Sequence, residues 1–538
     1  LHTRARTCER ERHESAFKMT TTTTSTHRGV SFVPRRKKSG TQTSSSFASS
    51  HQQKKLQRRR TTTRTPVKCQ SKELEIALIR EQTIVQDLVR WCIENGFSGS
   101  GLGVRPSTSG KGRGLEATRL VEKDECVLTL PLRSGIVDEA KGHPEHTREV
   151  IEKAPWGVRL ACRLLQERKK GAESAYAAYL ELIPENVETS PLHYASEEVS
   201  RICYPPMEKE IEEMRKAVKK WYDDLNAGEG KEALAGASEE EFKCAVAVVH
   251  SRTYGVSSGD TGEGYFRALL PLADLLNHGG DEYIDETRSS TSTVSTETVA
   301  WSEITDEEDE SEIAFTAQKT LEPGEEALMS YGERSNDHFL LYYGFVPRKN
   351  PHDDVIIFEN FDSAMMWHAM CFDEFWRRED IAIREQNAVR AYKETSKMLR
   401  ETSDGALIDA EPRLKVLSDG RVDARVLAAF AALYAGDSEL ANNQETDRES
   451  LNAARKDVAL RCEQLIQTVQ KQSGKGEAEE MFSEDSSNKS RNKNNNNNNN
   501  SNNTNTNNRN DIENVVDAFR RHKMFILRDC VRKLNVAL

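Results

Sequence analysis

The 538-residue sequence lacks features that define several familiar protein classes. No apolar run approaches the roughly 18 to 20 residues that a bilayer requires, which excludes a transmembrane helix. The ten cysteines contain no Cys-x-x-Cys pair, so neither a zinc finger nor a disulfide scaffold is indicated. The His-Glu-x-x-His pattern is also missing, which argues against a zincin-type metal site.

Acidic residues are missing from the head of the chain. Residues 19–70 hold twelve Lys or Arg and no Asp or Glu, and Thr and Ser dominate the rest. This composition predicts a disordered organellar transit peptide over residues 1–70, with a plastid favoured. Residues 1–18 precede the first methionine, Met19, and resemble untranslated upstream sequence. The basic runs 35–38 and 58–60 leave a nuclear or nucleic-acid role open as the alternative.

The body of the chain has the opposite charge. The whole sequence carries a net charge of -11 and residues 1–18 hold five bases and three acids, so residues 71–538 carry -25. A strongly acidic surface argues against binding to a phosphate backbone and suits a partner that presents cationic groups. We therefore expect a protein partner, with neither nucleic acid nor membrane involved.

The hydrophobic patterns predict an α+β fold with helices toward the C-terminus. Apolar spacing predicts a helix over 72–95, and the apolar run 126–131 predicts a buried strand. Two further strands are expected at 312–317 and 327–331. Long helical patterns follow residue 351, interrupted by an Asn-rich tract over 474–510 that we expect to be disordered.

The glycine-rich stretch 99–114 first suggests a nucleotide phosphate site. It does not fit the Walker A pattern, because Gly112 follows Lys111 where Ser or Thr is needed. A dinucleotide fingerprint would follow a strand, whereas this stretch follows a predicted helix. What remains is flexible backbone near some other ligand.

Five motifs in order carry a more specific signal. They are Gly112–Ala117 with the run 120–131, Tyr179–Pro184, Ser251–Tyr254, Leu270–His278, and Ser330–Gly332 followed by Tyr342–Phe345. Together they resemble the SET-domain protein methyltransferases, and within them the plant Rubisco large-subunit methyltransferase-like class. The match departs at Val256, where the class has a second arginine, and in the length of the acidic segment 279–312.

The resemblance implies a division of the chain. It implies a SET domain over 71–358, with a helical insertion at about 145–245 and an acidic loop at 279–312. An all-α substrate-binding domain would follow over 359–538. The class lacks the Cys-rich segment that binds zinc in many histone methyltransferases, so no metal is expected.

The resemblance also implies S-adenosylmethionine as the cofactor and assigns residues to its site. The residues implied to bind the cofactor are Arg113, Gly114, Leu115, Arg252, Asn277, His278, Tyr343, Gly344 and Phe345. Tyr331 would be the catalytic side chain that orients the accepting amine and the methyl group. Tyr254 and Met329 would line the lysine channel, and Asp274 would contact substrate.

The implied activity is methylation of a lysine side chain on a protein, with a plastid stromal protein such as Rubisco large subunit or aldolase as substrate. One relative of the class methylates histidine and lacks an aromatic residue at the position of Tyr254, so Tyr254 favours lysine. Two alternatives stay open. One is a non-catalytic module that binds a basic peptide on a SET scaffold, and the other is a nuclear histone-lysine methyltransferase.

Overall fold

The computed structural model describes residues 74–78, 83–106, 113–139, 143, 145–257, 265–284, 292–305, 311–401, 412–435, 448–471 and 503–537. The predicted transit peptide and most of the Asn-rich tract lie outside these residues. All described residues belong to one compact unit, Val67–Leu538. No helix among them is long and apolar enough to cross a membrane.

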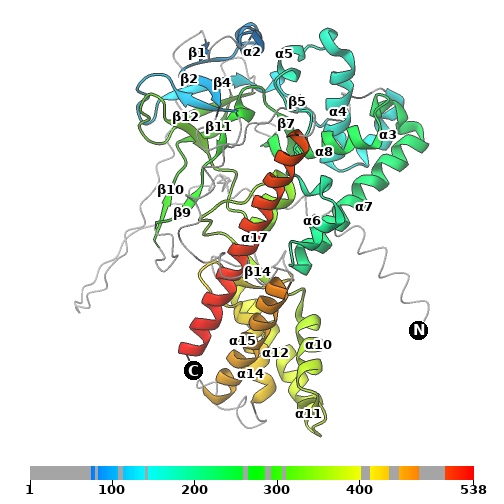
Figure 1. Ribbon diagram of the computed structural model, residues 1–538, viewed down its shortest axis with the longest axis vertical. Coiled ribbons are helices and arrows are strands. Elements are labelled where there is room, and N and C mark those ends of the chain that lie inside the picture. The colour runs from blue at the N-terminus through cyan, green and yellow to red at the C-terminus, as the bar shows by residue number, and fades with distance from the viewer. Residues whose placement is uncertain are drawn as a thin grey trace, which may run out of the picture. The chain divides into compact units, whose positions relative to one another are not determined.

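The predicted α+β fold is confirmed, and the largest sheet of the described residues has eight strands, of which β1, β2, β4, β11 and β12 lie together at the upper left of Figure 1. Its strand order is β11-β12-β4-β2-β3-β13-β8, with β1 added beside β2. The bounds are β1 Leu74–Leu78, β2 Ser98–Pro106, β3 Arg113–Ala117, β4 Cys126–Pro131, β8 Asn277–His278, β11 Val299–Thr305, β12 Ser311–Ala317 and β13 Glu326–Met329. All six residues of β4 are buried, as its apolar run predicts.

The remaining strands of the described residues form three smaller sheets. They are β5 Ile136–Val137 with β7 Tyr265–Leu269 and β6 Thr253–Ser257, then β9 Asp281–Tyr283 with β10 Thr293–Ser295, and β14 Asp354–Phe358 with β15 Leu414–Leu417. The strand β15 lies inside the segment expected to be all helical. It pairs with β14, about 60 residues earlier in the chain, and local periodicity carries no trace of such a pairing.

Two local predictions need correction. The predicted helix over 72–95 is a helix only from Thr83 to Glu94 (α2), because residues 74–78 form β1, which pairs in parallel with β2. The predicted acidic loop 279–312 holds β9, β10 and β11, and its acidic run 306–310 lies outside the described residues. All seven residues of β11 pair with β12, and Val299 is fully buried, so this segment is part of the main sheet.

Helices fill the region between β5 and β6. Their bounds are α3 Arg148–Glu152, α4 Trp156–Lys170, α5 Ala177–Leu180, α6 Ser196–Ser200, α7 Pro205–Ala227 and α8 Glu239–Arg252. Ser238 caps α8 through a reciprocal pair of hydrogen bonds with Glu241. The helix α8 ends at Arg252 and leads directly into β6, which places Arg252 and Tyr254 at the boundary between helices and sheet.

The C-terminal helices are α9 Asn336–His338, α10 Phe361–Cys371, α11 Asp373–Trp376, α12 Ile381–Glu401, α14 Ala424–Tyr434, α15 Arg448–Lys471 and α17 Asn503–Val536. The helix α17 begins within the Asn-rich tract that the sequence predicts to be disordered over 474–510. In Figure 1 α17, drawn in red, passes beside β14 and α15.

The described residues form two hydrophobic cores. The first, here called the SET core, runs from Val85 to Met329 and joins the main sheet to α2, α4 and α8. The second, the helical core, joins β14, β15 and the C-terminal helices to residues 194–211 of the helical region and to Leu340 and Leu341. The helical core therefore includes segments from inside the predicted SET domain, while the predicted domain boundaries stay predictions.

Candidate active site

Three of the predicted motifs lie on adjacent strands. The strand β8 pairs in parallel with β13, so Asn277 lies opposite Leu328 and His278 opposite Met329. On its other side β13 pairs with β3, which sets Ala327 opposite Leu115. Segments separated by about 160 residues in the chain thus meet at one place in the sheet.

Aromatic side chains gather at the end of β13. The rings of Tyr331 and Tyr343 stack at 5.2 Å between centroids, with 26° between their planes. His278 lies 5.1 Å from Tyr331 and 4.7 Å from Phe339, and Phe345 meets Tyr331 edge-on at 6.4 Å. The structure therefore brings together four residues that the sequence proposed separately, and adds Phe339.

Gly344 permits the turn that places Tyr343 and Phe345. Its φ angle of +73° lies in the left-handed region, and a Cβ atom there would lie 2.8 Å from Oγ1 of Thr189. Both constraints favour glycine. The turn follows directly on a π-helical turn, Phe339–Tyr343.

Two tyrosine hydroxyls point at carbonyls of one short segment. Tyr331 donates to the carbonyl oxygen of Leu276 at 2.7 Å, and Tyr254 donates to that of Ala273 at 2.8 Å. The Tyr254 hydroxyl also lies 3.8 Å from the sulfur of Met329. Burial raises the pKa of Tyr331 above its usual range, so its phenol stays protonated at neutral pH.

The half-buried Arg252 and the buried Asp274 form an ion pair beside these tyrosines. The Arg252 guanidinium donates to the Asp274 carboxylate at 3.3 Å and to its backbone carbonyl at 3.1 Å, and Tyr179 donates to the same carboxylate at 3.1 Å. Burial raises the pKa of Asp274, and Arg252 opposes that shift. Nε of Arg252 and Oδ1 of Asp274 are buried without a hydrogen-bond partner. The predicted contact of Asp274 with substrate stays a prediction, because its contacts here are internal.

Asn277 connects β8 to its neighbour β13 and to β3, the next strand of the sheet. Its amide donates to Glu326 at 2.7 Å and to the backbone carbonyl of Arg113 at 3.4 Å. The Arg113 side chain is exposed and reaches the carbonyl of Leu182 at 3.4 Å. Gly114 and Leu115 are buried in β3, so their backbone is what they can offer a ligand.

Several contributors to this site have no signal in the sequence. The carbonyls of Ala273 and Leu276 act through backbone geometry, and Glu326 acts through its strand neighbour. Trp301 packs edge-on against Tyr254 at 5.9 Å from within the segment predicted to be a loop. The β-branched and aromatic residues Val299, Trp301 and Ile304 were the available signal for a strand there.

Two groups of metal-type ligands occur among the described residues, and neither contains a predicted site residue. One is His193, Glu240 and Cys244, and the other is Asp281, Glu333 and His352. The second group lines a pocket of about 160 Å³ together with His278, Ser330 and Phe339. Each group includes an exposed acid, so the geometry makes no strong case for an ion, and the absence of metal stays a prediction.

Comparison with known proteins agrees with this geometry. The chain is similar to solved structures of Rubisco LSMT: the SET domain bound to lysine and AdoHcy (TM-score 0.56, 15% identity, 84% of this chain and 91% of that one) and the enzyme bound to AdoMet (TM-score 0.55, 15% identity, 85% and 92%). At this identity the likeness shows the fold, and the fold of the chain is that of the SET domain. The predicted resemblance is confirmed at this level.

Curated relatives are similar over a shorter range. Actin-histidine N-methyltransferase of Xenopus tropicalis is 25% identical over 304 residues, which are 54% of this chain and 48% of that protein. The Homo sapiens protein of the same name is 27% identical over 282 residues, 50% and 44% respectively. The chain thus spans about half the length of the curated relatives it matches. No family model matches the chain.

Proposed function

We propose that this chain is an S-adenosylmethionine-dependent protein methyltransferase that acts on lysine. The observation that carries the proposal is the Tyr331 hydroxyl, held at 2.7 Å from the Leu276 carbonyl inside the aromatic cluster at the end of β13. The solved neighbours with this fold bind AdoMet or AdoHcy, and one binds lysine. The curated relatives are methyltransferases by name.

The residues present fit this cofactor. The unpartnered Nε of Arg252 is a buried cationic donor of the kind that pairs with a carboxylate. The backbone of Gly114 and Leu115, the side chain of Asn277 and the rings of His278, Tyr343 and Phe345 supply polar and aromatic surfaces within reach of one another. When bound, S-adenosylmethionine would supply a methyl group on a sulfonium sulfur, which leaves as a neutral thioether.

The role of this chain is to place the acceptor. Transfer needs a neutral amine, and a free lysine amine with its pKa near 10.4 is mostly protonated at neutral pH. Tyr254 contacts the sulfur of Met329 and the rings of Trp301 and Phe315. An amine held beside this apolar cluster would have a lowered pKa, because apolar surroundings disfavour its charge. The Tyr331 hydroxyl donates its proton to the Leu276 carbonyl, so its oxygen can accept a hydrogen bond from the amine and orient it. The carbonyls of Ala273 and Leu276 provide nearby acceptors for weak C–H contacts.

Histidine is the second candidate acceptor, because the curated relatives are named for actin histidine. Tyr254 argues for lysine. Its ring packs edge-on against Trp301 and Phe315, and its hydroxyl donates to the Ala273 carbonyl and lies 3.8 Å from the sulfur of Met329. An aromatic side chain fixed in this way suits a linear acceptor beside Met329 better than an imidazole ring.

The test is transfer of labelled methyl from S-adenosylmethionine by the full chain, with a stromal extract and purified actin offered separately. Mass spectrometry of any labelled protein would identify the residue. Methyl-lysine supports the proposal, whereas methylhistidine would replace it with the second candidate. Failure of the chain to bind the cofactor in calorimetry would favour the non-catalytic peptide-binding module.

The Tyr331→Phe variant tests the assigned role. We expect at least about 100-fold slower transfer, because one preorganised hydrogen bond at a reacting centre is worth that much. Cofactor affinity should stay within about threefold, since the ring remains. Undiminished turnover would refute the role of Tyr331.

We further propose a plastid as the site of action, with a stromal protein as substrate. The support is the acid-free, Ser- and Thr-rich composition of residues 19–70. Fluorescence of a reporter fused to residues 19–70 would test this. Nuclear signal would favour the chromatin-directed alternative.

A further inference from the structure

A buried ionic cluster joins the last helix of the chain to the turn that carries the aromatic residues of the site. Nζ of Lys523, on α17, donates to Oδ2 of Asp337 and to Oδ1 of Asp353, both at 2.8 Å. It also donates to the backbone carbonyl of Asp354. The Lys523 side chain is fully buried, and its ammonium lies 5.0 Å from the Phe519 ring centroid.

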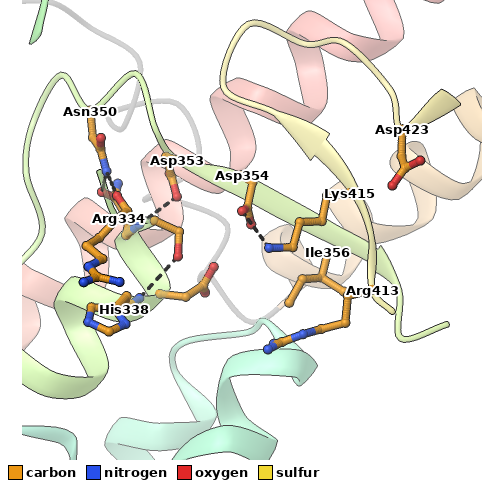
Figure 2. A network of polar contacts seen from close by, with 12 residues as sticks. Arg334, His338, Asn350, Asp353, Asp354, Ile356, Arg413, Lys415 and Asp423 are labelled. Atoms are coloured by element: carbon orange, nitrogen blue, oxygen red, sulfur yellow. Dashed lines mark hydrogen bonds and ion pairs between the residues drawn. The ribbon is translucent and has the colours of Figure 1, made fainter. Parts of the chain in front are cut away.

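The cluster holds α9 from two sides. Asp337 is the middle residue of α9, and the π-helical turn Phe339–Tyr343 follows directly. Asp353 also accepts a hydrogen bond from the backbone N–H of Asn336 at 2.9 Å, which ties the first residue of α9 to the start of β14. Figure 2 shows Asp353 and Asp354 beside each other at the start of β14, where Asp354 accepts a hydrogen bond from Lys415. Lys523 therefore bridges α9 and β14.

The charge balance makes Lys523 necessary. Lys415 pairs with Asp354 at 3.0 Å, whereas Asp337 and Asp353 form their ion pairs with Lys523. Burial and the neighbouring carboxylates raise the pKa of Asp337 to about 7, although Lys523 opposes the shift. Burial lowers the pKa of Lys523, but the carboxylates around it outweigh that effect and raise it. Without the ammonium, two buried carboxylates would face each other with no cation between them.

Besides Lys523, the contacts of the cluster are the hydrogen bond from the Asn336 N–H to Asp353 and one from the Asn350 amide to Oδ1 of Asn336 at 2.9 Å. Oδ1 of Asp337, Oδ2 of Asp353 and Nδ2 of Asn336 are buried and lack hydrogen-bond partners. Buried polar atoms in this state are costly, so the contacts that the cluster does make decide its position. Phe339 and Tyr343, which contact His278 and Tyr331, follow Asp337 closely in the chain, so a displacement of Asp337 would be passed to them.

We propose that Lys523 is a positioning residue of the active site. It holds α9 so that Phe339 and Tyr343 complete the aromatic cluster around Tyr331, and the C-terminal helix α17 is thereby required for the site without lining it. The identity of the bound ligand, S-adenosylmethionine, rests on the proposed function; the positioning of the aromatic residues does not.

The experiment compares two variants of the full chain that change fully buried residues of the same helix. Lys523→Met removes the ammonium and keeps the aliphatic stem, whereas Ile526→Ala opens a cavity in the helical core and leaves the cluster intact. Two readouts are measured at matched fraction folded: the dissociation constant for S-adenosylmethionine and amide hydrogen exchange over Phe339–Tyr343.

We expect Lys523→Met to weaken cofactor binding about tenfold or more and to accelerate exchange in this turn. Ile526→Ala should leave the dissociation constant within twofold and the exchange of the turn unchanged. Equal effects of both variants on either readout would overturn the proposal, since they would indicate general destabilisation. If the wild-type chain binds no cofactor, the proposed function fails, but the exchange measurement still decides the positioning role.

A second variant covers the case in which Lys523→Met does not fold. Asp337→Asn keeps the shape of the side chain and removes one of the two carboxylates that pair with Lys523. We expect faster exchange over Phe339–Tyr343 and several-fold weaker cofactor binding. Wild-type values for both readouts would overturn the proposal.

Discussion

The two cores of the described chain differ in how deeply they bury a cation. At the site in the SET core two tyrosine hydroxyls donate to the backbone carbonyls of Ala273 and Leu276, and Arg252, which pairs with the buried Asp274, keeps 26% of its side chain exposed. In the helical core the side chain of Lys523 is fully buried between Asp337 and Asp353. A hydroxyl bound to a carbonyl leaves a neutral surface that a ligand can share, whereas a buried ion must keep its partner. The site therefore lies in the first core, and the anchoring contacts lie in the second.

The largest expected effect on stability tests this contrast directly. Asp353→Asn removes a carboxylate from Lys523, so we expect the free energy of unfolding to fall by about 3 kcal/mol. The same substitution at Asp224, which pairs with Lys220 on the exposed face of α7, should change it by no more than about 0.5 kcal/mol. Urea denaturation of the two variants measures both. Similar losses would mean that burial of the ions does not distinguish the helical core.

A smaller effect is expected where the SET site meets the helical region. Gly344→Ala adds a Cβ atom 2.8 Å from Oγ1 of Thr189 at a φ of +73°, so we expect a loss of about 2 kcal/mol and weaker cofactor binding. Gly324→Ala is the matched control, because its φ is +87° but no atom lies within 4 Å of the added Cβ. It should show the backbone strain alone, about 1 kcal/mol. Equal melting temperatures for the two variants would show that the contact with Thr189 relaxes freely.

The smallest effect concerns pH. Burial, with a contribution from Arg267, lowers the pKa of His250 to about 4, against an ordinary value near 6.5. Its contribution to stability is present above pH 6.5 and is lost as the pH falls toward 4, because only the unfolded chain takes up the proton. The difference in unfolding free energy between wild type and His250→Gln should therefore shrink by about 1 kcal/mol from pH 7.5 to 5.5. A difference that is independent of pH would show that His250 titrates normally in the folded chain.

The sequence predicted the part of the site that short motifs encode. Tyr331, Tyr343, His278 and Asn277 each stand in a recognisable motif, and the structure brings them together as the resemblance implies. The sequence did not predict residues that reach the site only because distant strands pair, such as Glu326 and Trp301. The strands β1 and β15 were missed for the same reason, since each depends on a partner elsewhere in the chain. The Lys523 cluster was also invisible, because nothing in the local sequence of α17 shows which carboxylates its lysine will meet.

The make-up of the helical core has a consequence for how such a chain can be inherited. The core is assembled from residues 194–211, residues near 340–358 and the C-terminal helices, with the sheet strands between the first two. No single crossover between related genes could exchange this core alone. A break between residues 211 and 340 leaves residues 194–211 with one parent and the C-terminal helices with the other, and a break before residue 194 also exchanges β6 to β13. In a recombinant chain, the three segments of the core would have to be compatible with one another. Substrate preference, where it depends on the C-terminal helices, is therefore expected to diverge by point substitution and not by the swapping of a module.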